Sequence, residues 1–165
     1  MTYRQGNIND LPQLKKLALT SWSRFQADLT EENWLLLKNS LKDDKTYTEL
    51  LLKATCFVCE NNAAEIIGMG FLVPHGNPTE IYDSSWCYIR FLTVDPNYSG
   101  KGIGKCLTKK CIQLAIDNNE KTIALHTSEL MHNAMHIYES NGFKIVRELE
   151  PRLGKRYWLY TLEIG

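Results

Sequence analysis

A glycine-rich segment at residues 94–105 carries the clearest chemical signal in the chain. It reads Val-Asp-Pro-Asn-Tyr-Ser-Gly-Lys-Gly-Ile-Gly-Lys and joins a β-rich run to an amphipathic run. Glycines let a backbone approach a ligand closely and adopt positive φ without a Cβ clash. A helix beginning near Gly104 would present unpaired N–H groups and the positive end of its dipole. The segment therefore predicts a site for a phosphate-like anion.

The spacing of this segment does not match the two commonest phosphate loops. A Walker loop needs Lys followed by Ser or Thr after a longer spacing, whereas Lys105 is followed by Cys106. A dinucleotide fingerprint needs Gly-x-Gly-x-x-Gly, and here Gly104 comes too early after Gly100 and Gly102. Taken alone, the segment is equally consistent with an ordinary glycine turn that carries a surface lysine.

A second motif, at residues 134–143, reads Ala-Met-His-Ile-Tyr-Glu-Ser-Asn-Gly-Phe. The two motifs together resemble those of the GNAT superfamily of N-acetyltransferases. That family has a Gln/Arg-x-x-Gly-x-Gly/Ala loop for acetyl-CoA, matched here by Ser99 to Gly104 after Val94-x-Pro96. Its later Ala-x-x-Leu-Tyr-x-x-x-Gly-Phe motif is matched by Ala134 to Phe143. Both motifs occur in the family's order, and the resemblance extends over the whole chain.

The resemblance implies a fold and an activity. The fold is α/β (α+β), with a mostly antiparallel mixed sheet of about six or seven strands, a splayed parallel pair and about four or five flanking helices. Residues 1–165 would form a single domain that transfers an acetyl group from acetyl-CoA, without a metal, to a primary amine. The acceptor would be a small molecule or a peptide, attacking the thioester directly. A non-catalytic acetyl-CoA-binding or regulatory module of the same fold is the alternative.

The resemblance also assigns roles to individual residues. In the family a bulge in the fourth strand exposes an amide to the acetyl oxygen, and by residue match the bulge falls on Leu92 to Val94, with Leu92 as donor. Tyr138 is the expected general acid, because a phenol of pKa ~10 suits a departing thiolate of pKa ~8.5. The residues expected to bind the cofactor are Leu92, Thr93, Val94, Ser99, Gly100, Lys101, Gly102, Ile103, Gly104, Lys105, Asn133 and Tyr138.

Two positions depart from the family pattern. Ser99 replaces the Gln or Arg that usually opens the loop, and Met131 stands where many members have Asn, with Asn133 out of register. Both changes remove side-chain contacts to the cofactor and leave the backbone donors in place.

The sequence leaves the general base open. A lysine-like amine is about 99.9% protonated at pH 7 and must lose a proton before it attacks. The family's catalytic Glu aligns with Tyr88, which is not a ready base at neutral pH. Glu80, Asp83, His126 and a water chain are the alternatives, with His126 expected at the end of the fifth strand, near the cleft. Aromatic residues of the first two helices, Trp22, Phe25 and Trp34, either belong to the core or border the acceptor site.

Hydrophobic periodicity predicts the elements that position these residues. Leucines from Leu11 onward share one helical face, and Thr30 can cap a second helix. The other predicted helices are 44–54, the glycine loop to about Asn118, and about Leu130 to Asn141. The predicted strands are Thr2 to Gln5, Cys56 to Glu60, Ile66 to Val73, Ser85 to Val94, Thr122 to Thr127, Lys144 to Leu149 and Tyr157 to Ile164.

Composition limits the class of partner. Nineteen basic and nineteen acidic residues give zero formal net charge, which argues against nucleic-acid binding. The longest apolar run, Ile66 to Pro74, is shorter than the ~20 residues of a membrane span. Five scattered cysteines make a poor disulfide framework, and the spacing of Cys56 and Cys59 to the histidines does not fit zinc. We expect a soluble cytoplasmic protein with a small-molecule or peptide partner, and we leave a homodimer open.

Overall fold

Seven strands form one sheet in the computed structural model, which describes residues 1–165. Their order across the sheet is β1-β2-β3-β4-β5-β7-β6. All neighbouring strands are antiparallel except β4 and β5, which are parallel. This confirms the predicted mixed sheet. The strands are β1 (Thr2–Gln5), β2 (Thr55–Glu60), β3 (Ile66–Val73), β4 (Cys87–Val94), β5 (Thr122–Ser128), β6 (Lys144–Arg152) and β7 (Lys155–Glu163).

Five α-helices cover the two faces of the sheet. As predicted, Thr30 caps α2, because its hydroxyl accepts the N–H of Asn33 at 3.1 Å. None of the five has both the length and the apolar composition that a bilayer crossing requires. The helices are α1 (Leu11–Ser23), α2 (Glu31–Lys42), α3 (Asp44–Lys53), α4 (Ile103–Asp117) and α5 (His132–Ser140).

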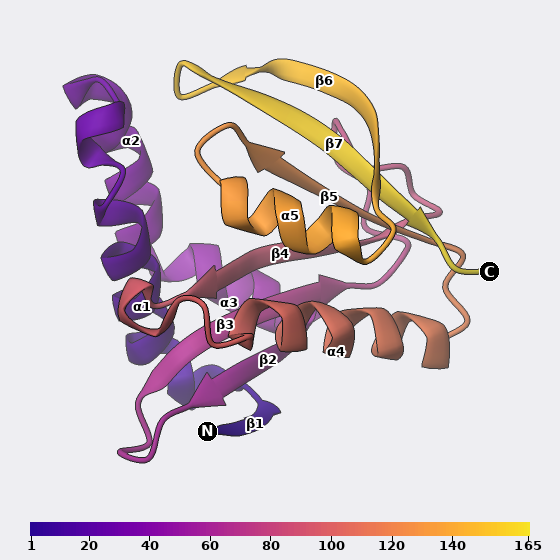
Figure 1. The fold of residues 1–165 in the computed structure, drawn as a ribbon, viewed down its shortest axis with the longest axis horizontal. Helices are drawn as coiled ribbons and strands as arrows, with labels where there is room; N and C mark the ends of the chain where they lie inside the picture. Colours follow the sequence, from indigo (N-terminus) through magenta and orange to yellow (C-terminus); the bar gives the residue numbers. More distant parts are fainter.

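The core lies on both faces of the sheet. The larger cluster packs beneath α1, α2 and α3, whereas two smaller clusters pack beneath α4 and α5 (Figure 1). Every residue of β3 is buried, as expected for a central strand covered on both faces. Cys56 belongs to the cluster on the first face and Cys59 to a cluster beneath α4, so the two thiols point to opposite faces of the sheet.

Strands β4 and β5 pair only at their beginnings. The pairs are Cys87 with Ile123 and Tyr88 with Ala124, and the strands diverge beyond them (Figure 1). The β4 backbone after Tyr88 therefore has no strand partner on its β5 side. The splayed parallel pair implied by the resemblance is present, and the glycine loop and α5 lie beside the opening.

A β-bulge interrupts β4 within this opening. Arg90 pairs with Phe71 and Thr93 with Met69, so Phe91 and Leu92 together oppose a single residue of β3. Phe91 has φ of 52°, a conformation that costs a non-glycine residue on the order of 1–3 kcal/mol. The Thr93 hydroxyl donates to the Phe91 carbonyl at 3.0 Å and helps hold this conformation. The bulge is thus centred on Phe91 and Leu92, slightly before the predicted 92–94.

Several element boundaries differ from the sequence prediction by one to three residues. β6 continues past Leu149 to Arg152, because it is an edge strand and an edge strand tolerates a proline such as Pro151. A tight turn at Leu153 and Gly154, both with positive φ, then leads directly into β7. β4 begins two residues later than predicted, because the Asp83 carboxylate accepts the Ser85 N–H and forms a turn. α5 begins at His132 after a turn in which the Met131 N–H donates to the Ser128 carbonyl.

Candidate active site at the opening between β4 and β5

The glycine loop leaves open space at the start of α4. Gly100 and Gly102 have φ of 77° and 79°, and a Cβ at either would meet no atom within 4 Å. These glycines are therefore required for the positive φ of the loop and for ligand access to its backbone, and not for close packing. Gly102 is the N-cap of α4 and provides no side-chain acceptor for the first N–H groups of the helix. Such unpaired amides, together with the helix dipole, favour an anion at this point.

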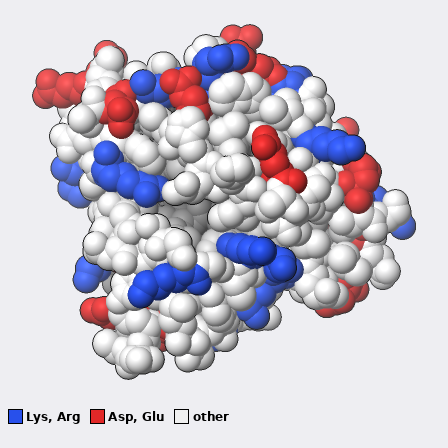
Figure 2. Space-filling view, viewed as in Figure 1, with Lys and Arg blue, Asp and Glu red and all other residues white.

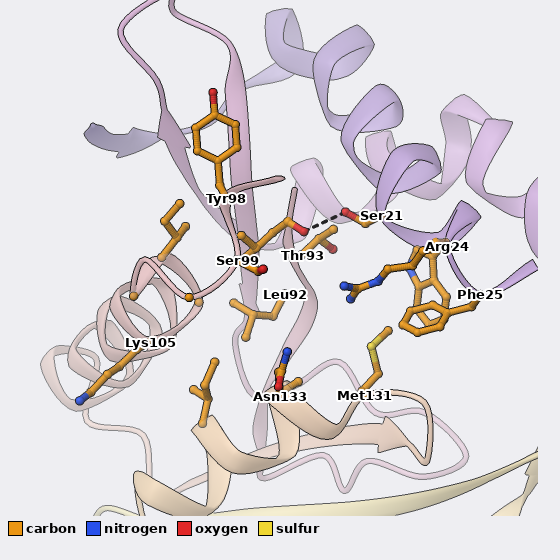
Figure 3. Close-up of a pocket in the computed structure, with 18 residues that line it drawn as sticks. Ser21, Arg24, Phe25, Leu92, Thr93, Tyr98, Ser99, Lys105, Met131 and Asn133 are labelled. Carbon is orange, nitrogen blue, oxygen red and sulfur yellow. Dashed lines mark hydrogen bonds between the residues drawn. The ribbon is translucent and has the colours of Figure 1, made fainter. Parts of the chain in front are cut away.

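A cavity of about 480 Å³ lies beside this loop, and we call it the loop-side cavity (Figure 3). Lys101, predicted to contact the cofactor, does not line it; its ammonium lies 5.4 Å from the centroid of the Tyr98 ring. Most of the other predicted cofactor residues do line it, namely Leu92, Thr93, Val94, Ser99, Gly100, Gly102, Ile103, Gly104, Lys105 and Asn133.

Helix α1 closes the loop-side cavity on the side facing β4. The Ser21 hydroxyl donates to the Val94 carbonyl at 3.0 Å, and the Arg24 side chain reaches into the cavity beside Phe25 (Figure 3). The Asp95 N–H donates to the Ile67 carbonyl of β3. Successive residues of an antiparallel strand direct their N–H and C=O groups to opposite sides, so those of Val94 point away from β3. Sequence reasoning missed Ser21 and Arg24, since they precede the glycine loop by many residues and match no motif.

A second cavity of about 250 Å³ lies on the other side of the bulge, and we call it the helix-side cavity. Its walls come from all the helices except α4, together with β4, the end of β5 and the start of β7. The two cavities share lining residues, and the bulge residue Leu92 is one of them. A ligand in either cavity therefore approaches the same stretch of β4. The shared residues are Trp22, Leu92, Thr93, Met131 and Ala134.

Tyr138 lines the helix-side cavity and not the loop-side cavity. Its ring packs against Phe143 and Tyr160 at centroid distances of 5.8 and 6.5 Å. The Tyr138 hydroxyl has no hydrogen-bond partner in the chain. It is nevertheless not sealed from solvent, because Oε2 of Glu120 is the only side-chain polar atom that is both fully buried and without a partner. The Tyr138 hydroxyl therefore borders the cavity. Burial raises the pKa of Tyr138 above its usual value, so the phenol is protonated at neutral pH.

Three of the four candidate bases lie away from both cavities. Tyr88 is buried and donates to the Asn77 carbonyl at 2.9 Å, and its burial raises its pKa. Glu80 is exposed and pairs with Arg152 at 3.3 Å. Asp83 accepts the N–H and hydroxyl of the nearby Ser85, and these hydrogen bonds lower its pKa. Their observed contacts are structural.

His126 is the one candidate base that lines the helix-side cavity. Its Nδ1 lies 2.5 Å from the Tyr82 hydroxyl, and the Tyr82 ring stacks on Tyr88 at 4.1 Å. Burial, together with the nearby charges of Arg90 and Arg152, lowers the pKa of His126 to about 3. The imidazole is therefore neutral at physiological pH. The sequence placed His126 near the cleft but gave no signal for Tyr82 or Arg90.

Of the three aromatic residues considered for the acceptor site, two line a cavity and one belongs to the core. Trp22 lines both cavities and Phe25 lines the loop-side cavity. Trp34 is buried and lines neither.

The molecular surface is hollowed near the glycine loop, and Lys and Arg side chains lie on both sides of the hollow (Figure 2). Among the residues that line the loop-side cavity, Arg24 and Lys105 are cationic and none is acidic. This charge distribution suits a ligand with phosphate groups, although the chain as a whole has no net charge.

Known proteins resemble this chain in sequence and in fold. Human N-acetyltransferase 8B is 30% identical over 139 residues, which is 84% of this chain and 56% of that protein. The N-acetylaspartate synthetase of Xenopus tropicalis is 42% identical over 65 residues, or 39% of this chain and 24% of that protein. The PaiA N-acetyltransferase of Thermoplasma acidophilum, solved in complex with coenzyme A, shares the fold with a TM-score of 0.77 at 17% identity. That match covers 99% of this chain and 98% of the other.

The strongest assignment comes from a family model rather than from a single relative. The model for the acetyltransferase (GNAT) family matches residues 13–143, a span that contains the glycine loop, the β4 bulge and the Ala134 to Phe143 motif. The chain spans little more than half the length of human N-acetyltransferase 8B. Because the match includes most of the sequence and the whole opening between β4 and β5, the chain belongs to the acetyltransferase (GNAT) family.

Proposed function

We propose that residues 1–165 act as one domain that transfers an acetyl group from acetyl-CoA to a primary amine of a small molecule or peptide. The observation that carries this proposal is the meeting of two cavities at the β4 bulge. One cavity has backbone donors and cations suited to phosphate, and the other has a neutral imidazole and a protonated phenol. Family membership and the coenzyme A complex of a fold neighbour support the same assignment.

Binding of acetyl-CoA would rely mainly on backbone groups. The first N–H groups of α4, at Ile103, Gly104 and Lys105, would donate to pyrophosphate oxygens, and the Lys105 ammonium would add charge. The Val94 peptide groups, turned away from β3, would pair with the amides of the pantetheine arm. The replacement of the usual Gln or Arg by Ser99 removes none of these donors.

Acetyl transfer would take place beside the bulge. The amine nitrogen attacks the thioester carbonyl carbon, and the Leu92 N–H donates to the oxygen that becomes negatively charged. Collapse of the tetrahedral species breaks the carbon–sulfur bond, and Tyr138 gives its proton to the departing sulfur. The proton lost by the amine would pass to water or to the neutral His126 imidazole, which lines the helix-side cavity and whose lowered pKa makes it a weak base.

The proposal is tested by binding and by turnover. Acetyl-CoA should raise the melting temperature by linkage, and release of free thiol should accompany addition of a suitable amine. The amine panel should include polyamines, aminoglycosides, amino acids and short peptides. Absence of both a thermal shift and calorimetric heat with saturating acetyl-CoA would overturn the proposal. Binding without turnover of any amine would instead favour an acetyl-CoA-binding module.

A further inference from the structure

A single charged side chain lines the helix-side cavity. Among its lining residues Arg90 is the only Arg, Lys, Asp or Glu. Arg90 is half-buried, and its guanidinium forms no ion pair or hydrogen bond with the chain. Its aromatic neighbour is Phe91, whose ring centroid lies 5.7 Å from the guanidinium carbon. The cavity thus contains a positive charge that the protein itself does not neutralise.

Arg24 and Arg147 also lack an ion pair, but both are exposed to solvent, and the other three arginines are paired. Arg4 pairs with Asp10 and Glu60, Arg152 pairs with Glu80, and Arg156 pairs with Glu148. A charge withdrawn from water is costly unless it is paired, and a guanidinium presents a planar set of donors that matches a carboxylate. The missing partner of Arg90 is therefore expected to be an anion that enters the cavity.

The position of Arg90 relates this anion to the reaction. Arg90 lies two residues before Leu92 on β4, at the start of the bulge, and both residues line the helix-side cavity. In an α-amino acid the carboxylate and the amine are attached to the same carbon. A carboxylate bound by the Arg90 side chain would therefore hold the amine beside the bulge, where the two cavities meet.

The other walls of the helix-side cavity suit an apolar substituent. Ile89, Phe91, Met131 and Tyr157 line it together with leucines of α2 and β4, and the remaining polar groups are mainly hydroxyls. No carboxylate is present to hold a second ammonium group. The charge of Arg90 also acts on His126, since it helps to lower the pKa of that imidazole, so the two side chains face the same space.

We propose that the acceptor is an apolar α-amino acid or a close analogue, with its single carboxylate bound by Arg90. This inference rests on the acetyl transfer proposed above and narrows its acceptor from any primary amine to one chemical class. Arg90 would be a specificity-determining residue, and it would take no part in bond making or breaking. Polyamines and aminoglycosides would be poor acceptors, because they bring further positive charge to a cavity that already holds an unpaired cation.

The test compares three acceptors that differ at one group: phenylalanine, phenylalanine amide and phenethylamine. Wild-type protein should prefer phenylalanine, and Arg90→Gln should lower kcat/KM for it by about tenfold to a hundredfold, mainly through KM. The same substitution should leave kcat/KM for the two analogues that lack a carboxylate nearly unchanged. Arg90→Lys should restore part of the preference, because it keeps the charge and loses the planar donor set.

Two controls separate specificity from damage to the fold. Arg147→Gln removes an exposed arginine of β6 outside both cavities and should change nothing. The thermal shift produced by acetyl-CoA should be the same in all variants. A readout without turnover is calorimetric binding of N-acetylphenylalanine to protein saturated with coenzyme A, which Arg90→Gln should weaken. Binding of N-acetylphenethylamine should not respond to that substitution.

The outcomes distinguish this inference from the proposed function. Turnover of phenethylamine or spermidine in preference to phenylalanine would overturn the role of Arg90 and leave acetyl transfer standing. An equal loss with all three acceptors in Arg90→Gln would also overturn it. If no amine is turned over, the proposed function fails, and the two N-acetyl ligands still decide whether Arg90 selects a carboxylate.

Discussion

The two sides of the candidate site are built from different kinds of group. The loop-side cavity takes its anion-binding donors from a short stretch of backbone at residues 99–105. The helix-side cavity is assembled from side chains of four helices and three strands. Backbone donors recognise phosphate whatever side chains surround them, whereas assembled side chains determine which acceptor fits. This difference assigns cofactor binding to the loop-side cavity and acceptor choice to the helix-side cavity, and substitutions on one side should therefore have different effects from substitutions on the other.

The largest effect is expected at Gly102. Gly102→Val places a β-branched side chain at φ of 79° in the space before α4, so it should abolish the thermal shift given by acetyl-CoA. Gly76→Val is the matched control, because Gly76 has φ of 89°, has equally open surroundings and lies outside both cavities. Both variants should lose some stability, but only the control should keep its thermal shift. A normal shift in Gly102→Val would remove the loop from the binding site.

The next effect concerns Tyr138, on the helix side. Tyr138→Phe should keep the packing and the acetyl-CoA affinity while lowering kcat by about tenfold to a hundredfold, at or below the low end of the range typical of general acid catalysis. Burial raises the pKa of Tyr138, so any alkaline limb that it causes should lie above the usual pH for a tyrosine.

Tyr160→Phe is the control for this substitution. It also deletes a hydroxyl from the same core cluster, one that bonds to Glu139 at 3.0 Å, but Tyr160 lines neither cavity. The control should leave kcat unchanged. Wild-type turnover by Tyr138→Phe, under conditions where chemistry limits the rate, would reduce Tyr138 to a core residue.

The same contrast explains what sequence reasoning could reach. The loop and the Ala134 to Phe143 motif are contiguous, so their spacing could be read directly, and almost every residue predicted from them lines a cavity. Ser21, Arg24 and Tyr82 match no motif, because tertiary packing brings them to the site. Arg90 matches none either, although it lies on β4 two residues before Leu92. Lys101 was wrongly expected at the cofactor because of a contact within the loop itself: its ammonium lies over the ring of Tyr98, three residues earlier, instead of at the cavity.

Most of the fold could also be predicted from contiguous sequence patterns. Strand and helix positions follow local periodicity, and the strand pairing was implied by the family resemblance. The bulge position and the length of β6 depend on cross-strand registers and on the turn at Leu153 and Gly154, which no local pattern specifies. The sequence likewise could not decide whether Trp22 and Trp34 belong to the core or to the site. In the structure Trp22 lines both cavities, whereas Trp34 is buried and lines neither.

A moderate effect on stability is expected from His126. Its folded pKa of about 3 lies below the unfolded value near ~6.5, so between these values the unfolded chain binds a proton that the folded chain does not. The free energy of unfolding should therefore fall as the pH drops, by about 1–2 kcal/mol between pH 7 and pH 5. Denaturant titrations of His126→Gln should show a smaller slope against pH. His132→Gln, at an exposed position of α5, should keep the wild-type slope.

The smallest effect compares two lysines of the loop side. Both Lys101 and Lys105 were predicted to contact the cofactor, but only Lys105 lines the cavity. Exposed charge pairs are typically worth about 0.2–1 kcal/mol, so Lys105→Ala should weaken acetyl-CoA binding roughly twofold to fivefold. Lys101→Ala should have no measurable effect in the same calorimetric titration. Added salt should shrink the difference between wild type and Lys105→Ala, because screening acts on the exposed ammonium and leaves the helix amides available. A larger loss for Lys101→Ala than for Lys105→Ala would mean that the loop changes conformation when the ligand binds.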